Sequence, residues 1–181
     1  MRLTGRKSFI TGAAKGIGLS VARAFAAEGA AVALADISEE ESKKQSLEIK
    51  ETYGVDAIGV KCDVGDTISV QNAIKETSEA FNGLDTIACM AATLTERLDV
   101  VDLPEDEWNR TLNVNLTGSF LVCKHGIPFL REAGGGSIIL TASQMGQVAW
   151  PGSTAYCTTK GGILQLVKGI ALDHKDENIR C

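Results

Sequence analysis

The sequence predicts an α/β fold, in which a doubly wound parallel sheet of the Rossmann type carries helices on both faces. Short apolar runs alternate with segments of helical periodicity, which is the pattern of βαβ units. A glycine-rich turn separates the first apolar run from the first helical segment. The 181 residues contain no linker and no repeat, so we expect one domain over residues 1–181.

The expected strands and helices alternate along the chain. Strands are expected over Ser8–Thr11, Val32–Ala35, Ala57–Cys62, Thr86–Met90 and Ser137–Leu140. Helices are expected over Ile17–Glu28, after Ser38, through the apolar face Val70, Ala73, Ile74, Thr77 and Phe81, and over Glu105–Arg131 and Ser153–Lys175. Ser38 and Glu41 have the spacing of a capping box, and Pro128 is expected to bend or loosen the end of its helix.

Composition excludes several classes of protein. Hydrophobic residues make up 44% and charged residues 23%, as in ordinary globular proteins. A net charge of -5 and a pI near 5.1 argue against binding to nucleic acid. The apolar runs are too short to cross a membrane, and the N-terminus runs straight into a strand without a signal peptide, so we expect a cytoplasmic protein. The five scattered cysteines favour free thiols over disulfides, and no metal site is expected.

The glycine-rich turn, Thr11–Gly18, has the spacing G-x-x-x-G-x-G. Glycines let the backbone approach a pyrophosphate, and the helix N-terminus offers free N–H groups to the negative charge. The candidate cofactor-binding residues here are Gly12, Lys15, Gly16, Ile17 and Gly18. The alternative is a tight turn that only joins a strand to a helix.

Asp36 ends the second expected strand, where an acidic residue would hydrogen-bond the ribose hydroxyls of the adenosine. Its carboxylate should repel the 2′-phosphate of NADP, which favours NAD, whereas Lys15 in the turn would attract that phosphate. Asp36 could instead cap the helix near Ser38. Asp63, directly after the third strand, could touch the adenine edge or simply form a turn.

Tyr156 and Lys160 are four residues apart on an expected helix, so their side chains share one face. A free phenol ionises near pH 10, and a neighbouring ammonium favours the phenolate, which suits acid/base catalysis. Ser143 follows the fifth strand at the edge where ligands bind, and could hold a substrate oxygen. Asn115 could position a water that feeds protons to Lys160. Each residue taken alone could also be an ordinary surface, cap or helix residue.

In combination these features resemble the soluble, single-domain branch of the short-chain dehydrogenase/reductases. The resemblance rests on Thr11–Gly18, Asp36, Cys62-Asp63-Val64, Asn113-Val114-Asn115, Ser143 and the Tyr156-x-x-x-Lys160 pair. It implies hydride transfer between NAD(P)(H) and a secondary alcohol or ketone, with an Asn115–Ser143–Tyr156–Lys160 tetrad. It also implies that Asp63, Val64, Ala91, Tyr156 and Lys160 contact the cofactor, and that the two longest helices pair subunits into a homodimer or homotetramer.

Two departures from the family pattern stand out. Cys89-Met90-Ala91-Ala92 replaces the usual N-N-A-G, whose first Asn helps to tie the central strands together. Asn178–Cys181 resembles the opening of the family's sixth strand, so the resemblance implies a C-terminally truncated chain that lacks the last strands and the substrate lid. We therefore expect Ser137–Leu140 to be a buried strand with an unpaired edge, and the chain by itself to be marginally stable.

Two alternatives to an active dehydrogenase stay open. One is a truncated, inactive relative that binds nucleotide or pairs subunits. The other is a different Rossmann enzyme such as a methyltransferase, which would not need the Tyr-x-x-x-Lys pair. The substrate-determining loop is expected over Gln144–Thr154, where Met145, Val148 and Trp150 form either an apolar wall or ordinary core cover.

Overall fold

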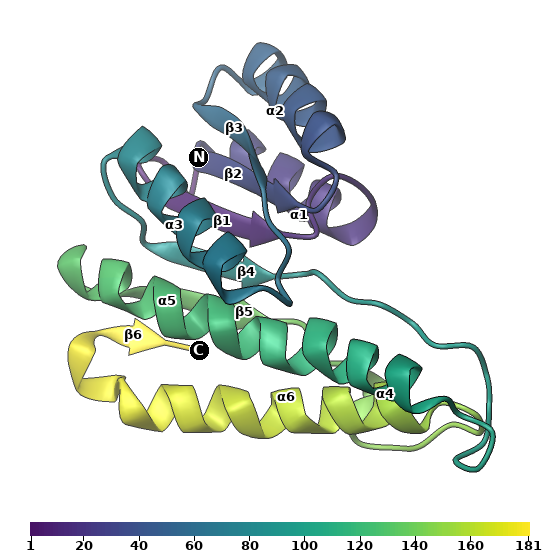
Figure 1. Cartoon of the computed structure of the whole chain (residues 1–181). Coiled ribbons are helices and arrows are strands. Elements are labelled where there is room, and N and C mark those ends of the chain that lie inside the picture. Colours follow the sequence, from purple (N-terminus) through teal and green to yellow (C-terminus); the bar gives the residue numbers. More distant parts are fainter.

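A computed structural model describes residues 1–181 and contains one six-stranded parallel sheet in the order β3-β2-β1-β4-β5-β6. Figure 1 shows the strands side by side with helices before and behind them. The strands are β1 Lys7–Thr11, β2 Ala31–Asp36, β3 Ala57–Lys61, β4 Thr86–Cys89, β5 Gly136–Leu140 and β6 Ile179–Arg180. The order reverses direction between β1 and β4, and ligands bind at such switch points in open α/β sheets. The predicted doubly wound fold is confirmed.

Helices cover both faces of the sheet. The helices α1 Gly16–Ala27 and α2 Glu39–Tyr53 lie on one face. The other face carries α3 Thr67–Phe81, α4 Glu105–Leu112, α5 Gly118–Glu132 and α6 Thr154–Asp173. None of these helices is long and apolar enough to span a membrane.

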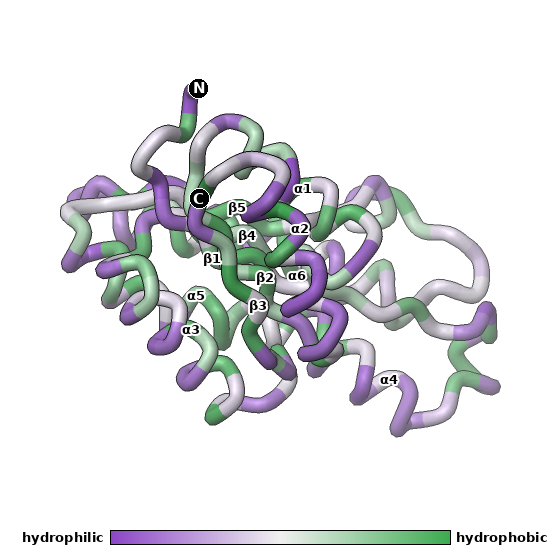
Figure 2. The backbone as a smooth tube through the Cα atoms, turned by 90° about the horizontal axis from the view of Figure 1, so that it is seen from above, coloured by the Kyte–Doolittle hydropathy of each residue, from purple (hydrophilic) through white to green (hydrophobic).

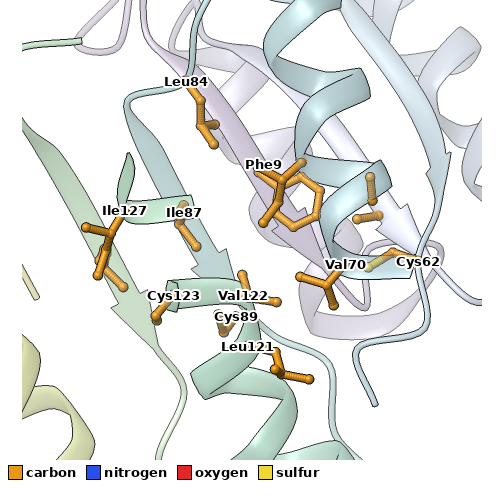
Figure 3. Packing of buried hydrophobic residues seen from close by; sticks show 14 of the residues in the cluster. Phe9, Cys62, Val70, Leu84, Ile87, Cys89, Leu121, Val122, Cys123 and Ile127 are labelled. Atoms are coloured by element: carbon orange, nitrogen blue, oxygen red, sulfur yellow. The ribbon is translucent and has the colours of Figure 1, made fainter. Parts of the chain in front are cut away.

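The core consists of two hydrophobic clusters, one on each side of the sheet. In Figure 2 the central strands are mostly hydrophobic and the hydrophilic stretches lie on the surrounding helices. All five apolar-face residues predicted for α3 are buried, which confirms that face. Figure 3 shows Phe9 of β1 among side chains from α3 and α5, with Cys89 beside Cys123. The five cysteines are free thiols, as predicted, and burial raises the pKa of Cys62 to about 12.

The long helix expected over Glu105–Arg131 is interrupted. A π-helical turn at Asn113–Thr117 separates α4 from α5, although the backbone stays helical throughout. Pro128 was expected to loosen the end of this helix, but α5 continues through it to Glu132. Proline removes only one donor from the helix, and the last turn is closed by the Ala133 N–H, which donates to the Phe129 carbonyl.

Two further expectations are corrected. The capping box at Ser38 does not form, because the Ser38 side chain makes no cap bond and Glu41 accepts a bond from Gln45 instead. The fifth strand is neither unpaired nor wholly buried. Gly136 and Ser137 pair with β6, and Ile139 is 38% exposed. The expected unpaired edge is therefore wrong at Gly136 and Ser137, whereas Ile138–Leu140 have no partner in β6.

Candidate active site

A cleft of about 410 Å³ opens at the carboxyl ends of β1, β2, β3 and β4. Eight of the nine cofactor-binding candidates outside the Tyr156–Lys160 helix line it, namely Gly12, Lys15, Ile17, Gly18, Asp36, Asp63, Val64 and Ala91, whereas the catalytic candidates Asn115 and Ser143 do not. Gly16 is not among the lining residues. Five more lining residues had not been singled out as candidates: Ile37, Cys62, Met90, Ala92 and Val114. Most of these residues are adjacent in the sequence to candidate residues. Their position shortly after a strand could have predicted that they line the cleft.

The glycines of the turn serve different purposes. Gly12 has φ +65°, and a Cβ there would lie 2.8 Å from the Ala91 backbone. A Cβ on Gly18 would meet the Gly12 carbonyl oxygen, so this glycine lets the start of α1 pack against the turn. Gly16 has φ +59° with no heavy atom near its Cβ position, so the backbone beside it is open to a ligand.

The N-terminus of α1 is free to bind an anion. Its N-cap is Lys15, no side chain caps it, and its first turn holds no acidic residue. By contrast, α2 and α4 each begin with three acidic residues, which neutralise the positive end of the helix. The free N–H groups of the helix start, the Lys15 ammonium and the absence of side chains at Gly12 and Gly16 together fit the pyrophosphate of a dinucleotide.

Asp36 joins the end of β2 to the glycine turn. Its Oδ2 accepts a hydrogen bond from the Ala14 N–H at 3.0 Å, and its Oδ1 accepts one from the Ser38 N–H at 3.0 Å. The helix-capping alternative for Asp36 is therefore correct in part. Each carboxylate oxygen keeps a lone pair, so the same residue can still accept bonds from ribose hydroxyls.

The segment after β4 is ordered without the usual asparagine. The buried Thr11 hydroxyl oxygen accepts hydrogen bonds from the Met90 and Ala91 N–H groups at 3.1 and 3.2 Å. On the other side, the Thr141 hydroxyl donates to the Met90 sulfur at 2.8 Å. The ends of β1, β4 and β5 are thus tied together through Met90.

Lys160 is buried, with 3% of the residue exposed, and its ammonium group donates to the Thr141 carbonyl at 2.6 Å. The same Nζ lies 5.6 Å from the centre of the Tyr156 ring. Burial lowers the pKa of Lys160 below its ordinary value. The four-residue spacing therefore places the buried Lys160 ammonium beside the Tyr156 ring.

Ser143 precedes the short 3₁₀ turn Gln144–Gly146, and its Oγ accepts a hydrogen bond from the Met145 N–H at 3.2 Å. The hydroxyl proton is left free to be donated to a ligand. This turn packs on α6 because Gly146 has no side chain; a Cβ there would lie 2.6 Å from the Lys160 carbonyl oxygen. Gly146 had not been recognised as a site residue.

Asn115 lies in the π turn and is buried. Its Oδ1 accepts a hydrogen bond from the Thr93 N–H at 2.7 Å, and its Nδ2 donates to the Thr93 carbonyl at 2.9 Å. A longer bond of 3.4 Å reaches the Thr159 hydroxyl of α6. The side chain therefore joins the segment after β4 to the helix that carries Tyr156 and Lys160.

A cleft at the switch point, an uncapped glycine-rich helix start and a lysine–tyrosine pair define the class of nucleotide-dependent α/β oxidoreductases. A family model described as enoyl-(acyl carrier protein) reductase matches residues 12–181. The chain belongs to the short-chain dehydrogenase/reductase family, whose members use NAD(P).

Named relatives are oxidoreductases of alcohols and diols. The chain is 37% identical over 179 residues to 2,5-dichloro-2,5-cyclohexadiene-1,4-diol dehydrogenase of Sphingobium indicum, covering 99% of this chain and 71% of the relative. It is 38% identical over 184 residues to trans-4-hydroxycyclohexanecarboxylate dehydrogenase of Sinomonas cyclohexanicum, covering 99% and 70%. The crystal structure of a putative short-chain alcohol dehydrogenase from Sinorhizobium meliloti superposes with a TM-score of 0.94 at 29% identity, covering 98% and 70%.

Proposed function

We propose that this oxidoreductase transfers a hydride reversibly between NAD(H) and a secondary alcohol or ketone. The observation that carries the proposal is the buried Lys160 ammonium beside the Tyr156 ring. Lys160 is the only buried lysine or arginine in the structure. When bound, the nicotinamide ring takes up the hydride from the alcohol carbon or returns it to the ketone.

The residues of the chain handle the proton. Ser143 donates its free hydroxyl proton to the substrate oxygen and holds it beside Tyr156. In oxidation the phenolate of Tyr156 takes the alcohol proton, and in reduction the phenol gives it back. The Lys160 ammonium stabilises the phenolate, and its lowered pKa makes it a readier proton donor toward that oxygen. Asn115 helps to position Tyr156 and Lys160, because its side chain joins α6 to the segment after β4.

We propose a cyclic secondary alcohol as the substrate. Val148 and Trp150 are 54% and 53% exposed in the loop that joins Ser143 to α6, and they offer an apolar surface to a carbon ring. Two relatives are named for alcohols on six-membered carbon rings. Absorbance of NADH should therefore rise when the protein is mixed with NAD and ring alcohols such as cyclohexanol derivatives, more than with open-chain sugars. Cofactor binding without turnover on any alcohol would favour the inactive relative instead.

We expect NAD to bind at least about tenfold more tightly than NADP, because a carboxylate at Asp36 would repel the 2′-phosphate of NADP. Asp36→Ala should narrow that ratio several-fold by removing the repulsion, with some loss of NAD affinity through the ribose hydroxyls and the Ala14 bond. Fluorescence titration of both cofactors measures the ratio. Asp56→Ala is the matched control, because Asp56 is an exposed carboxylate at the opposite end of β3 and does not line the cleft. Tighter binding of NADP by the unaltered protein would show that Lys15 dominates.

We also propose that α5 and α6 pair two or four copies of the chain. A groove of about 360 Å³ lies between these helices and includes Phe120, Ile127 and Leu166. Phe120 is an exposed aromatic residue, which is typical of a subunit contact. Light scattering should give a dimer or tetramer for the protein and a smaller species for Phe120→Glu. A monomeric unaltered protein would refute the proposal.

A further inference from the structure

The π turn at Asn113–Thr117 lies behind the cofactor cleft and touches both of its walls. Val114 lines the cleft, and the asparagines on either side of it point in different directions, since residues two apart on a helix do not face each other. One wall is the loop after β3, which contains Asp63 and Val64. The other is the segment after β4, which begins with Met90 and Ala91.

Asn113 holds the loop after β3. Its Nδ2 donates a hydrogen bond to the Gly65 carbonyl at 3.2 Å, and the Gly65 N–H donates to Asp63 Oδ1 at 2.9 Å. Gly65 has no side chain where Asn113 approaches, because a Cβ there would meet the Asn113 amide nitrogen. The Asp63–Val64 wall is therefore hydrogen-bonded to the π turn through this amide.

Arg110, one turn before Asn113, holds the segment after β4. Its Nη1 donates to the Thr93 hydroxyl oxygen at 2.6 Å, and its Nη2 donates to the Leu94 carbonyl at 3.4 Å. Glu107 orients the guanidinium with two bonds, from Nε at 3.0 Å and from Nη2 at 2.7 Å. Asn115 therefore holds the N–H and the carbonyl of Thr93, and Arg110 holds its side chain.

We propose that Asn113 and Arg110 are positioning residues that set the separation of the two walls of the cofactor cleft. Neither side chain lines the cleft, so each acts through the loop that it holds. The identity of the ligand rests on the proposed function, whereas the anchoring of the loops does not. Asn113 governs the wall on the adenosine side, and Arg110 governs the wall on the nicotinamide side, because a dinucleotide lies across the two halves of such a sheet.

Hydrogen exchange of the cofactor-free protein tests the anchoring directly. Asn113→Ala should speed exchange of the amides at residues 64–66 by roughly two- to tenfold, the effect of losing one hydrogen bond, and leave residues 92–95 unchanged. Arg110→Met should do the reverse, and Arg110→Lys should restore part of the protection because lysine can still reach Thr93. Asn109→Ala is the matched control, because Asn109 is an exposed asparagine on α4 whose side chain makes no hydrogen bond. Unchanged exchange in both variants, or equal effects on both loops, would overturn the proposal.

Binding of AMP and NADH by the same variants tests the consequence for the cleft. Asn113→Ala should weaken both ligands by a similar factor, roughly two- to tenfold, because both use the adenosine side. Arg110→Met should weaken NADH by a similar factor and leave AMP within about twofold of the unaltered protein. Failure of the unaltered protein to bind NADH refutes the proposed function, while the exchange experiment still decides the anchoring. Equal losses of AMP and NADH in Arg110→Met would refute the division between the walls.

Discussion

Tyr156→Phe is expected to lower turnover by about a hundred- to ten-thousandfold, the usual contribution of a general acid or base, while the affinity for NADH changes by less than about twofold. Only the phenol oxygen is lost, since the ring still fills its place beside Lys160. Without the phenol oxygen, the alcohol that Ser143 holds has no group to accept its proton. Stopped-flow measurement of NADH formation, paired with fluorescence titration of NADH, separates the two effects.

The chain provides a matched control for this variant. Tyr53, the only other tyrosine, lies at the end of α2 on the opposite face of the sheet from α6. Tyr53→Phe should leave both turnover and binding unchanged. If Tyr156→Phe kept more than about a tenth of the turnover, the proposed acid/base role would be wrong.

Lys160→Met is expected to abolish turnover and yet raise the stability of the folded protein by about 1 kcal/mol at pH 7. A methionine keeps the apolar stem and removes a charge whose burial costs several kcal/mol. The loss of the bond to the Thr141 carbonyl offsets part of this gain, by about 1–3 kcal/mol. The desolvation effect is the larger of the two, so the melting temperature should rise by a few degrees.

The pH dependence of stability gives an independent test. Burial lowers the pKa of Lys160 in the folded state, so the unfolded chain binds more protons between the folded and unfolded pKa values. Stability therefore rises with pH from the folded pKa up to the unfolded value near 10.4, above which the penalty is gone. Urea unfolding from pH 7 to pH 10 should show the unaltered protein gaining stability relative to Lys160→Met.

Lys168→Met, an exposed lysine on the same helix, is the control for loss of charge alone. It should change neither turnover nor the slope of stability against pH. A destabilised Lys160→Met protein would mean that the Thr141 bond outweighs desolvation. In that case Lys160 would be a structural as well as a functional residue.

Local pattern in the sequence was enough to predict five strands and the class of fold. Alternation of apolar runs and helical periods depends only on which face of each element is buried, and this information is local. The four-residue spacing of Tyr156 and Lys160 and the glycine-rich turn are local in the same sense. The predicted residues that line the cleft lie after a strand of the parallel sheet, either directly or in the glycine-rich turn that follows β1, where the carboxyl ends of the strands converge.

Contacts between residues far apart in the chain could not be predicted in this way. The Asp36 carboxylate accepts a hydrogen bond from the Ala14 N–H, 22 residues away in the chain. Met90 replaces an asparagine, yet Thr11 and Thr141 order its segment from about 80 and 50 residues away.

Local sequence pattern was sufficient to assign an α/β oxidoreductase of the short-chain dehydrogenase/reductase family and to predict eight of the residues that line the cleft at the carboxyl edge of the sheet. How the two walls of the cleft are held depends on the tertiary structure. Arg110 hydrogen-bonds Thr93, which lies 17 residues away in the chain, and Asn113 hydrogen-bonds Gly65, which lies 48 residues away. No periodicity encodes such contacts, because they exist only once the sheet has brought the strand ends together.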